Sequence, residues 1–203
     1  MKSNRVRIRR LRRAELPQET VKLARFLIGK TIVHQVAGER LSGRIVETEA
    51  YLPGDAACHA FNGETPRNRS LFLRHGHAYV YFVYGSHFML NVSGEGAGTG
   101  AGILLRAIEP LDGIERMQRR RGTRRLLDLA RGPGRLAAAL RINSRVDGLD
   151  LTGNRVLWLG TPVRPAGPIG VSVRIGITKD ADRLLRFYER GNPFVSGPKR
   201  LNK

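Results

Sequence analysis

This sequence has one cysteine, few acidic residues and no long apolar run, and each shortage excludes a class of protein. A single cysteine, Cys58, cannot form an internal disulfide, so a disulfide-stabilised scaffold is excluded and a reducing compartment is favoured. No apolar run reaches the roughly 18 residues of a membrane-spanning helix. Residues 1–13 lack the apolar core of a secretory signal peptide. We therefore expect a protein that is neither secreted nor inserted in a membrane.

The shortage of acidic residues leaves a large excess of positive charge. The chain has 17 acidic and 36 basic residues, a formal net charge of +19 and a pI near 11.4. Such a surface attracts polyanions. Six of the basic residues are lysine, so the other 30 are arginine, whose forked guanidinium pairs with phosphates and stacks on bases. A GC-rich genome would also favour arginine over lysine, and that explanation of the ratio stays open, but it does not account for the excess charge.

The length and hydrophobic content of the chain fit one globular domain. The 203 residues are 41% hydrophobic, which is enough for a sizeable core, and no repeat or shift in composition indicates a second domain. Residues 1–13 contain seven basic residues. We expect these to form a basic arm, flexible or loosely docked, that binds phosphate, and residues 14–203 to form the domain.

Apolar patterning predicts strands that mostly follow one another along the chain, with helices at a few points. The predicted strands span 31–36, 41–52, the two arms of a hairpin within 78–92, 100–110, 155–160 and 167–177. The predicted helices span 17–28, a segment capped by Asp112 and reaching about residue 121, and a segment opened by Gly132 and Pro133. Residues 116–131, rich in arginine, form either a basic helix pair or a loop. This order predicts a single α+β domain with an antiparallel sheet.

Two carboxylates stand together at the end of one predicted strand. In the stretch RIVETEAY, the period of two places Glu47, Glu49 and Tyr51 on the same face. Such a pair can bind a metal, act as acid and base, or form a solvated face. The scarcity of acidic residues argues against the solvated face, and the residues themselves do not decide between a metal site and an acid–base pair.

The histidines and the glycine-rich segments do not match known site patterns. His75-Gly76-His77 and Cys58-His59 lack the spacing of a closed zinc site, so we expect no metal. Residues 93–102 contain several glycines without the Lys-Ser/Thr ending of a phosphate-binding loop. The stretch RGPGR at 131–135 either seats a phosphate at a helix N-terminus or simply starts a helix.

An aromatic hairpin follows an arginine-rich loop. The hairpin stretch YVYFVYGSHFMLNV turns at Gly85-Ser86 and places Tyr84 at its tip, where the chain is normally most exposed to water. Arg67 and Arg69 come just before it. Arginines that bind phosphates, next to rings that contact bases, are typical of nucleic-acid recognition. Gly85 would let the chain reverse so that the Tyr84 ring projects beyond the sheet.

Six blocks, in the order of the chain, make a specific resemblance to the alkyladenine (3-methyladenine) DNA glycosylase family. The resemblance runs from about residue 17 to residue 196, and the six blocks read GRIVETEAY, TPRNRSLF, YVYFVYGSHFMLNV, ILLRAIEPLDG, RGPGRLAAAL and LRFYERGNPFVS. The resemblance implies a compact domain around a curved antiparallel sheet with flanking helices, from which a β-hairpin protrudes and inserts into DNA. It implies a monofunctional enzyme of base excision repair that uses no cofactor and no metal. Such an enzyme flips alkylated or deaminated purines (3-methyladenine, 7-methylguanine, hypoxanthine, ethenoadenine) out of duplex DNA and hydrolyses the N-glycosidic bond.

The resemblance also implies roles for individual residues. Glu49 matches the general base that activates water, and Arg106 a basic residue that helps to position the water and the phosphate. The residues that match the pocket for the flipped base are Tyr51, His59, Tyr81 and Asn91, whereas we expect Tyr79 to be a packing residue. Tyr84 matches the residue that wedges into the duplex, while Arg67 and Arg69 are our own candidates for DNA backbone contacts. The implied partner is double-stranded DNA with damaged purines, bound by a monomer in the cytoplasm of a bacterium or the nucleus of a eukaryote.

The chemistry of the reaction favours one catalytic carboxylate. An alkylated purine such as 3-methyladenine is already cationic and leaves without an acid, so Glu49 alone can suffice and Glu47 can instead pair with an arginine. Two rival functions stay open: a non-enzymatic protein that binds RNA or DNA, and a metal-dependent nuclease that uses Glu47, Glu49 and His59.

Overall fold

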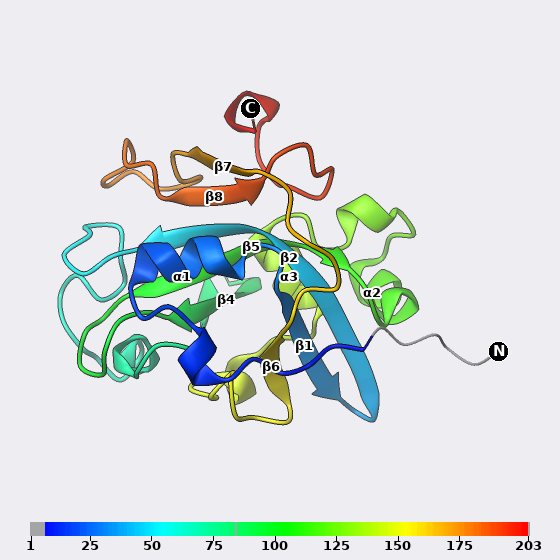
Figure 1. Cartoon of the computed structure of the whole chain (residues 1–203), viewed down its shortest axis with the longest axis horizontal. Coiled ribbons are helices and arrows are strands. Elements are labelled where there is room, and N and C mark those ends of the chain that lie inside the picture. Colours follow the sequence, from blue (N-terminus) through cyan, green and yellow to red (C-terminus); the bar gives the residue numbers. More distant parts are fainter. Residues whose placement is uncertain (1–6, 84, 203) are drawn as a thin grey trace.

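A curled antiparallel sheet is the framework of the structure (Figure 1), a computed structural model that describes residues 7–83 and 85–202. Within these residues its strands are β1 (Thr31–Val36), β2 (Glu39–Tyr51), β3 (Ala78–Val83), β4 (His87–Ser93), β5 (Gly102–Pro110), β6 (Leu157–Gly160), β7 (Ile169–Ser172) and β8 (Arg186–Glu189). The order across the sheet is β3-β4-β5-β2-β1-β6, and β8 pairs with both β2 and β7. Every one of these pairings is antiparallel, as the sequence predicts.

The long strand β2 is the centre of this arrangement. It pairs with β1 along its first half, with β5 along most of its length, and with β8 over Glu47–Glu49. Its pairing with β5 shifts register on both sides of Glu47. Such irregularities increase twist and bend a strand, which is how a sheet curls. The curl brings β8 against the part of β2 that carries the two glutamates (Figure 1).

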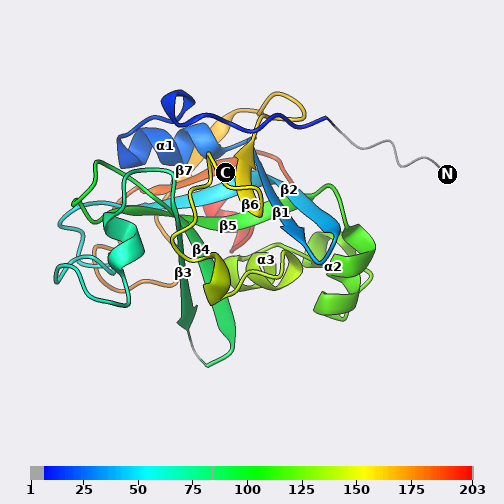
Figure 2. The same cartoon turned by 90° about the horizontal axis from the view of Figure 1, so that it is seen from below.

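Helices cover both sides of the sheet. In the described residues they are α1 (Thr20–Leu27), α2 (Ile114–Arg121) and α3 (Pro133–Ala139). The helix α1 packs on β2 and β5, whereas α3 packs on β4 and β5, and Figure 2 shows the two helices on opposite sides of the strands. Leucine and alanine side chains of both helices are buried in one apolar core together with those of the strands. None of these helices is long and apolar enough to cross a membrane.

Local predictions differ from the structure at helix ends and in the last strands: the strand predicted over 167–177 is the shorter β7, which ends at Ser172, and β8 is not among the predicted strands. The first helix begins at Thr20 rather than at residue 17, and Pro133 occupies the first turn of α3 as predicted. The prediction that Asp112 caps α2 is wrong. The helix starts after Gly113, whose φ of 77° is left-handed, and the Asp112 carboxylate accepts instead from Ser42 Oγ (2.6 Å). The arginine-rich segment 116–131 contains the end of α2 and one short 3-10 helix, Leu126–Asp128.

The hairpin pairs from Ala78↔Val92 to Val83↔His87, and the ends of β3 and β4 extend beyond the neighbouring elements in Figure 2. Tyr84, the residue predicted to enter DNA, lies outside the described residues. At the other end of the sheet, Arg10 bridges to Gly160 of β6, and Leu11 is buried against the core. The described end of the basic N-terminal segment is therefore docked on the sheet.

Candidate active site

Strand alternation builds one pocket on the face of the sheet that α3 covers. Every second residue of β3, β4 and β5 faces it, because successive side chains of a strand point to opposite faces. The pocket has a volume of about 390 Å³, within the range of small-ligand sites. The sheet residues that line it are Tyr51, Tyr79, Tyr81, Val83, Met89, Asn91, Gly102, Leu104 and Arg106, and Pro133 of α3 and loop residues such as Cys58, His59 and Ile175 complete it.

Three rings form one wall of the pocket. The rings of Tyr79 and Tyr81 stack with centroids 5.4 Å apart, and His59 meets Tyr81 edge-on at 4.4 Å. One hydrogen bond of 2.9 Å joins His59 Nδ1 to the Tyr79 hydroxyl. Burial lowers the pKa of His59, with a further contribution from the charge of Arg67, so the imidazole is neutral at physiological pH. Burial also raises the pKa of Tyr79, so its hydroxyl remains protonated.

Tyr51 occupies the end of β2 and lines the same pocket. The Arg174 guanidinium lies over its ring, 4.6 Å from the centroid. Arg174 is itself fixed by a buried ion pair with Asp55, and its Nη1 donates to Ala50 O (3.1 Å). The cation therefore holds the Tyr51 ring in place from behind. The Tyr51 hydroxyl donates to Glu49 Oε2 at 3.0 Å, and this bond connects the aromatic lining of the pocket to the Glu49 carboxylate.

Glu49 lies fully buried behind the pocket, held by three groups whose residues line it. Besides the Tyr51 hydroxyl, Ile175 N donates to Glu49 Oε1 (2.7 Å), and Arg106 Nη1 lies 3.3 Å from Oε2. Burial raises the pKa of Glu49 above its ordinary value, since Arg106 and the Ile175 N–H oppose the loss of solvation without cancelling it. A carboxylate that is more basic than usual, next to a pocket, is suited to accept a proton.

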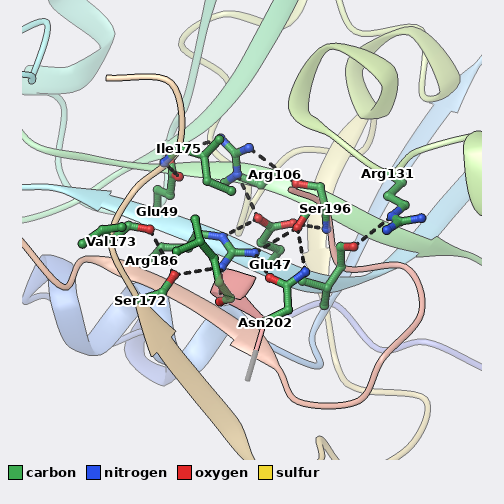
Figure 3. A network of polar contacts seen from close by, with 12 residues as sticks. Glu47, Glu49, Arg106, Arg131, Ser172, Val173, Ile175, Arg186, Ser196 and Asn202 are labelled. Carbon is green, nitrogen blue, oxygen red and sulfur yellow. Dashed lines mark hydrogen bonds and ion pairs between the residues drawn. The ribbon is translucent and has the colours of Figure 1, made fainter. Parts of the chain in front are cut away.

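Glu47 is equally buried, but it is surrounded by donors (Figure 3). Its Oε1 accepts from Arg106 Nε (2.9 Å) and from Arg186 Nε (2.7 Å), and its Oε2 accepts from Ser196 N (2.7 Å). Burial alone would raise the pKa of Glu47, but the two guanidinium groups outweigh it and hold the pKa below its ordinary value. The two carboxylates of ETEAY thus have pKa values displaced in opposite directions, a pattern that assigns them different roles.

The other predicted residues divide between the pocket and the surface. Asn91 is buried in the pocket and its Nδ2 donates to Tyr79 O (3.2 Å). Arg67 and Arg69 are exposed, and Arg67 Nη2 donates to Phe82 O (3.3 Å), which places it beside the hairpin. The metal ligand set of a nuclease is not assembled. Within the described residues, no group of three His, Cys, Asp or Glu side chains could hold an ion, and His59 bonds to Tyr79 instead.

Sequence reasoning missed several residues of the site. Tyr79, expected to be a packing residue, lines the pocket and bonds to His59. Its place two residues before Tyr81 on one strand is the signal that could have found it. Nothing local pointed to Arg174 or to the Ile175 N–H, since they contact Tyr51 and Glu49 across more than 120 residues of sequence.

A buried carboxylate behind a ring-lined pocket, on a molecule with a net charge of +19, is typical of an enzyme that acts on a polyanionic substrate. Comparison with known proteins identifies the family: residues 14–193 match the model of the methylpurine-DNA glycosylases (MPG), and the chain belongs to this family. It is therefore a DNA glycosylase, an enzyme of DNA repair, and the hypothesis of a non-enzymatic binding protein is wrong.

Curated relatives agree over nearly the whole chain. A protein of Mesorhizobium japonicum is 63% identical over 94% of this chain and 92% of its own length. One of Paraburkholderia phytofirmans is 51% identical over 99% of this chain and 94% of its own. One of Chlorobaculum parvum is 47% identical over 87% of this chain and 86% of its own. All three carry the provisional name 3-methyladenine DNA glycosylase.

Proposed function

We propose that this chain is a monofunctional glycosylase of base excision repair that acts on alkylated or deaminated purines in duplex DNA. The purine flips into the pocket, and water activated by Glu49 hydrolyses the N-glycosidic bond and leaves an abasic site. The observation that carries the proposal is the environment of Glu49: a buried carboxylate of raised pKa, held by Tyr51, Arg106 and the Ile175 N–H behind a pocket lined by rings.

The reaction balances with one carboxylate. The bond between C1′ and the base nitrogen breaks, its electron pair leaves with the base, and the positive charge of an alkylated purine is neutralised. Water oxygen forms the new bond to C1′ and passes a proton to Glu49. Because an alkylated purine carries its own positive charge, its release requires no second carboxyl acid, which agrees with Glu47 being held as an anion by two arginines. A neutral deaminated purine must also take up a proton from water as it leaves.

The pocket walls support selection of the base. A cationic base against the tyrosine rings gains about 0.5–2 kcal/mol from cation–π attraction. Arg174 covers one side of the Tyr51 ring, so we place the base on the other side, between Tyr51 and Tyr81. Neutral His59 can donate to or accept from the base, and Asn91 crowds the exocyclic amino group of unmodified guanine, which lacks the positive charge that favours 7-methylguanine against the rings. Damaged bases also flip more readily because they pair and stack less well.

The hairpin is the proposed contact with the duplex. Phe82 is 46% exposed on β3 and packs against Phe88 of β4 with ring centroids 4.9 Å apart. An exposed ring on a hairpin beside Arg67 suits insertion between bases with the backbone held by arginine. We propose that Tyr84 fills the vacated stack, that Arg67 and Arg69 bind phosphates, and that the enzyme acts as a monomer on double-stranded DNA.

The test replaces the proposed base. We expect Glu49→Gln to lower the single-turnover rate of base release by about 10²–10⁴-fold, the usual contribution of general-base catalysis, while the affinity for lesion DNA changes little. Duplexes that each contain one damaged purine are scored for abasic sites, with wild type and variant side by side. Base release by Glu49→Gln at the wild-type rate would remove Glu49 from the mechanism.

A further inference from the structure

Arg106 touches both glutamates of ETEAY, but in different ways. Its Nε donates to Glu47 Oε1 at 2.9 Å, and its Nη2 donates to Ser196 Oγ at 3.4 Å. These two contacts leave only Nη1 near Glu49, as an ion pair of 3.3 Å that does not meet the geometry of a hydrogen bond. The guanidinium is therefore oriented by Glu47 and Ser196, and it approaches Glu49 through Nη1 alone.

A buried guanidinium without this restraint pairs more fully with its carboxylate. On the same sheet, Arg44 Nη1 donates to Glu189 Oε2 at 2.6 Å and Arg44 Nη2 donates to Glu189 Oε1, which is the two-pronged geometry that arginine and carboxylate prefer. Arg106 would adopt the same pairing with Glu49 if it could turn. Two guanidinium donors would then be added to the Ile175 N–H and the Tyr51 hydroxyl, which already bond to the two Glu49 oxygens, and water would compete poorly for the remaining lone pairs.

Glu47 is itself held rigidly from a distant part of the chain (Figure 3). Arg186 of β8 bonds to Glu47 through Nε, and its two other nitrogens donate to Ser172 Oγ, Leu201 O, Ser196 O and Asn202 Oδ1. Each member of this network is buried or partly buried. Buried groups with locked partners hold a functional group in place more accurately than exposed ones.

We propose that Glu47 is a positioning residue that holds Arg106 away from a full ion pair with Glu49, so that Glu49 Oε2, which accepts a hydrogen bond from the Tyr51 hydroxyl, keeps a lone pair for the reacting water. This inference rests on the proposed role of Glu49 as the base. Ser196 shares the task, because its N–H fixes Glu47 and its hydroxyl contacts Arg106.

The consequence for pH dependence follows from the groups that face Glu49. Among the described residues these are Glu47 and Tyr51 on its own strand and Arg106 on β5, while Arg186 on β8 acts through its pair with Glu47 and Arg174, after β7, lies over the Tyr51 ring. Base release requires ionised Glu49, so the rate falls as the pH drops through the Glu49 pKa. If Arg106 turns fully toward Glu49, it favours the ionised carboxylate and lowers the Glu49 pKa. The acid limb of the pH–rate profile, where the rate falls as Glu49 gains a proton, then moves to lower pH.

The experiment measures single-turnover release of 7-methylguanine from a duplex, between pH 4 and 9, for four variants. We expect Glu47→Gln to shift the acid limb to lower pH and to lower the plateau rate by about 10- to 100-fold, the effect of a misplaced catalytic group. Ser196→Ala, which changes no charge, should shift the limb in the same direction by less. Glu189→Gln breaks a comparable buried pair that does not touch the pocket, so it should leave the limb in place.

The outcomes separate this inference from the proposed function. If folded Glu47→Gln leaves the acid side of the pH–rate profile unshifted, the inference is overturned. If Ser196→Ala leaves it unshifted, Glu47 acts on Glu49 through its charge alone, and its positioning role is overturned. If Glu47→Gln does not fold, Ser196→Ala decides alone. The fourth variant, Glu49→Gln, tests the base itself: if it releases the base at the wild-type rate, the proposed function fails first.

Discussion

At the scale of residues, this molecule depends on carboxylates that are buried against arginine. Asp55 with Arg174, Glu47 with Arg106 and Arg186, and Glu189 with Arg44 are all such pairs. Breaking such a pair leaves an unpaired charge inside the protein, which costs about 3–5 kcal/mol. The surplus of arginine therefore has an internal use besides the attraction of a polyanion.

The Glu189–Arg44 pair predicts how stability responds to acid. The Arg44 pairing and two further hydrogen bonds lower the pKa of Glu189 to about 2, although burial acts in the opposite direction. A carboxyl whose pKa falls on folding contributes stability that is present above its unfolded value near 4.3 and is lost as the pH falls through the folded value. We expect the free energy of unfolding to drop between pH 5 and pH 2.

Urea unfolding at a series of pH values checks this prediction. Glu189→Gln should be destabilised by about 3–5 kcal/mol at pH 7, and its stability should depend less on pH over that interval. The same slope in both proteins would show that other carboxyl groups carry the acid response.

At the scale of elements, the proposed function gives the hairpin β3–β4 two roles on one pair of strands. Its base supplies Tyr79, Tyr81 and Asn91 to the pocket, whereas its far end bears exposed Phe82 and the turn. Because alternate residues of a strand face opposite ways, the same six-residue strand can serve the pocket with one face and solvent or DNA with the other.

The proposed wedge is tested at the tip of this hairpin. Tyr84→Ala should abolish flipping, because nothing then fills the vacated stack, and flipping is read from the fluorescence of an ethenoadenine placed in a duplex. Val156→Ala, which shortens an exposed apolar side chain before β6 at the other end of the strand order from the hairpin, should flip normally. Normal flipping by Tyr84→Ala would assign the wedge to another residue, with Phe82 the first candidate.

At the scale of the whole molecule, the net charge of +19 predicts binding that is strongly dependent on salt. Each phosphate neutralised adds about −0.9 to the slope of the logarithm of affinity against the logarithm of salt concentration. Arg67→Ala and Arg69→Ala should each reduce the steepness of that slope by about one and weaken binding to damaged and undamaged duplexes alike.

A titration of duplex DNA between 50 and 300 mM salt measures this slope. Arg155, exposed before β6 at the other end of the strand order from the hairpin, provides the matched control. If Arg155→Ala changes the slope as much as Arg67→Ala does, the positive charge attracts DNA as a diffuse field, and the loop that carries Arg67 and Arg69 does not make a specific phosphate contact.

Much of the fold follows from local pattern. The apolar patterning of residues 31–36 predicts the strand β1 with its observed ends, and the antiparallel α+β class follows from the succession of strands. The hairpin, with its turn at Gly85-Ser86, is also predictable, because these residues favour reversal of the chain. Helix ends are less accurate, as at Asp112, because a tertiary contact with Ser42 outweighs local capping.

The sequence by itself determined that Glu47 and Glu49 share one face of a strand with Tyr51, and that the chain has a large excess of arginine. Strand period and composition can both be read from the residues without the fold. Only the tertiary structure decided what distinguishes the two glutamates. Arg186, 139 residues from Glu47, and the Ser196 N–H hold one of them as an anion, whereas Glu49 faces the pocket residues with fewer donors and a raised pKa. The physical reason is that pKa depends on burial and on nearby charges in space, which the register between β2, β5 and β8 brings together.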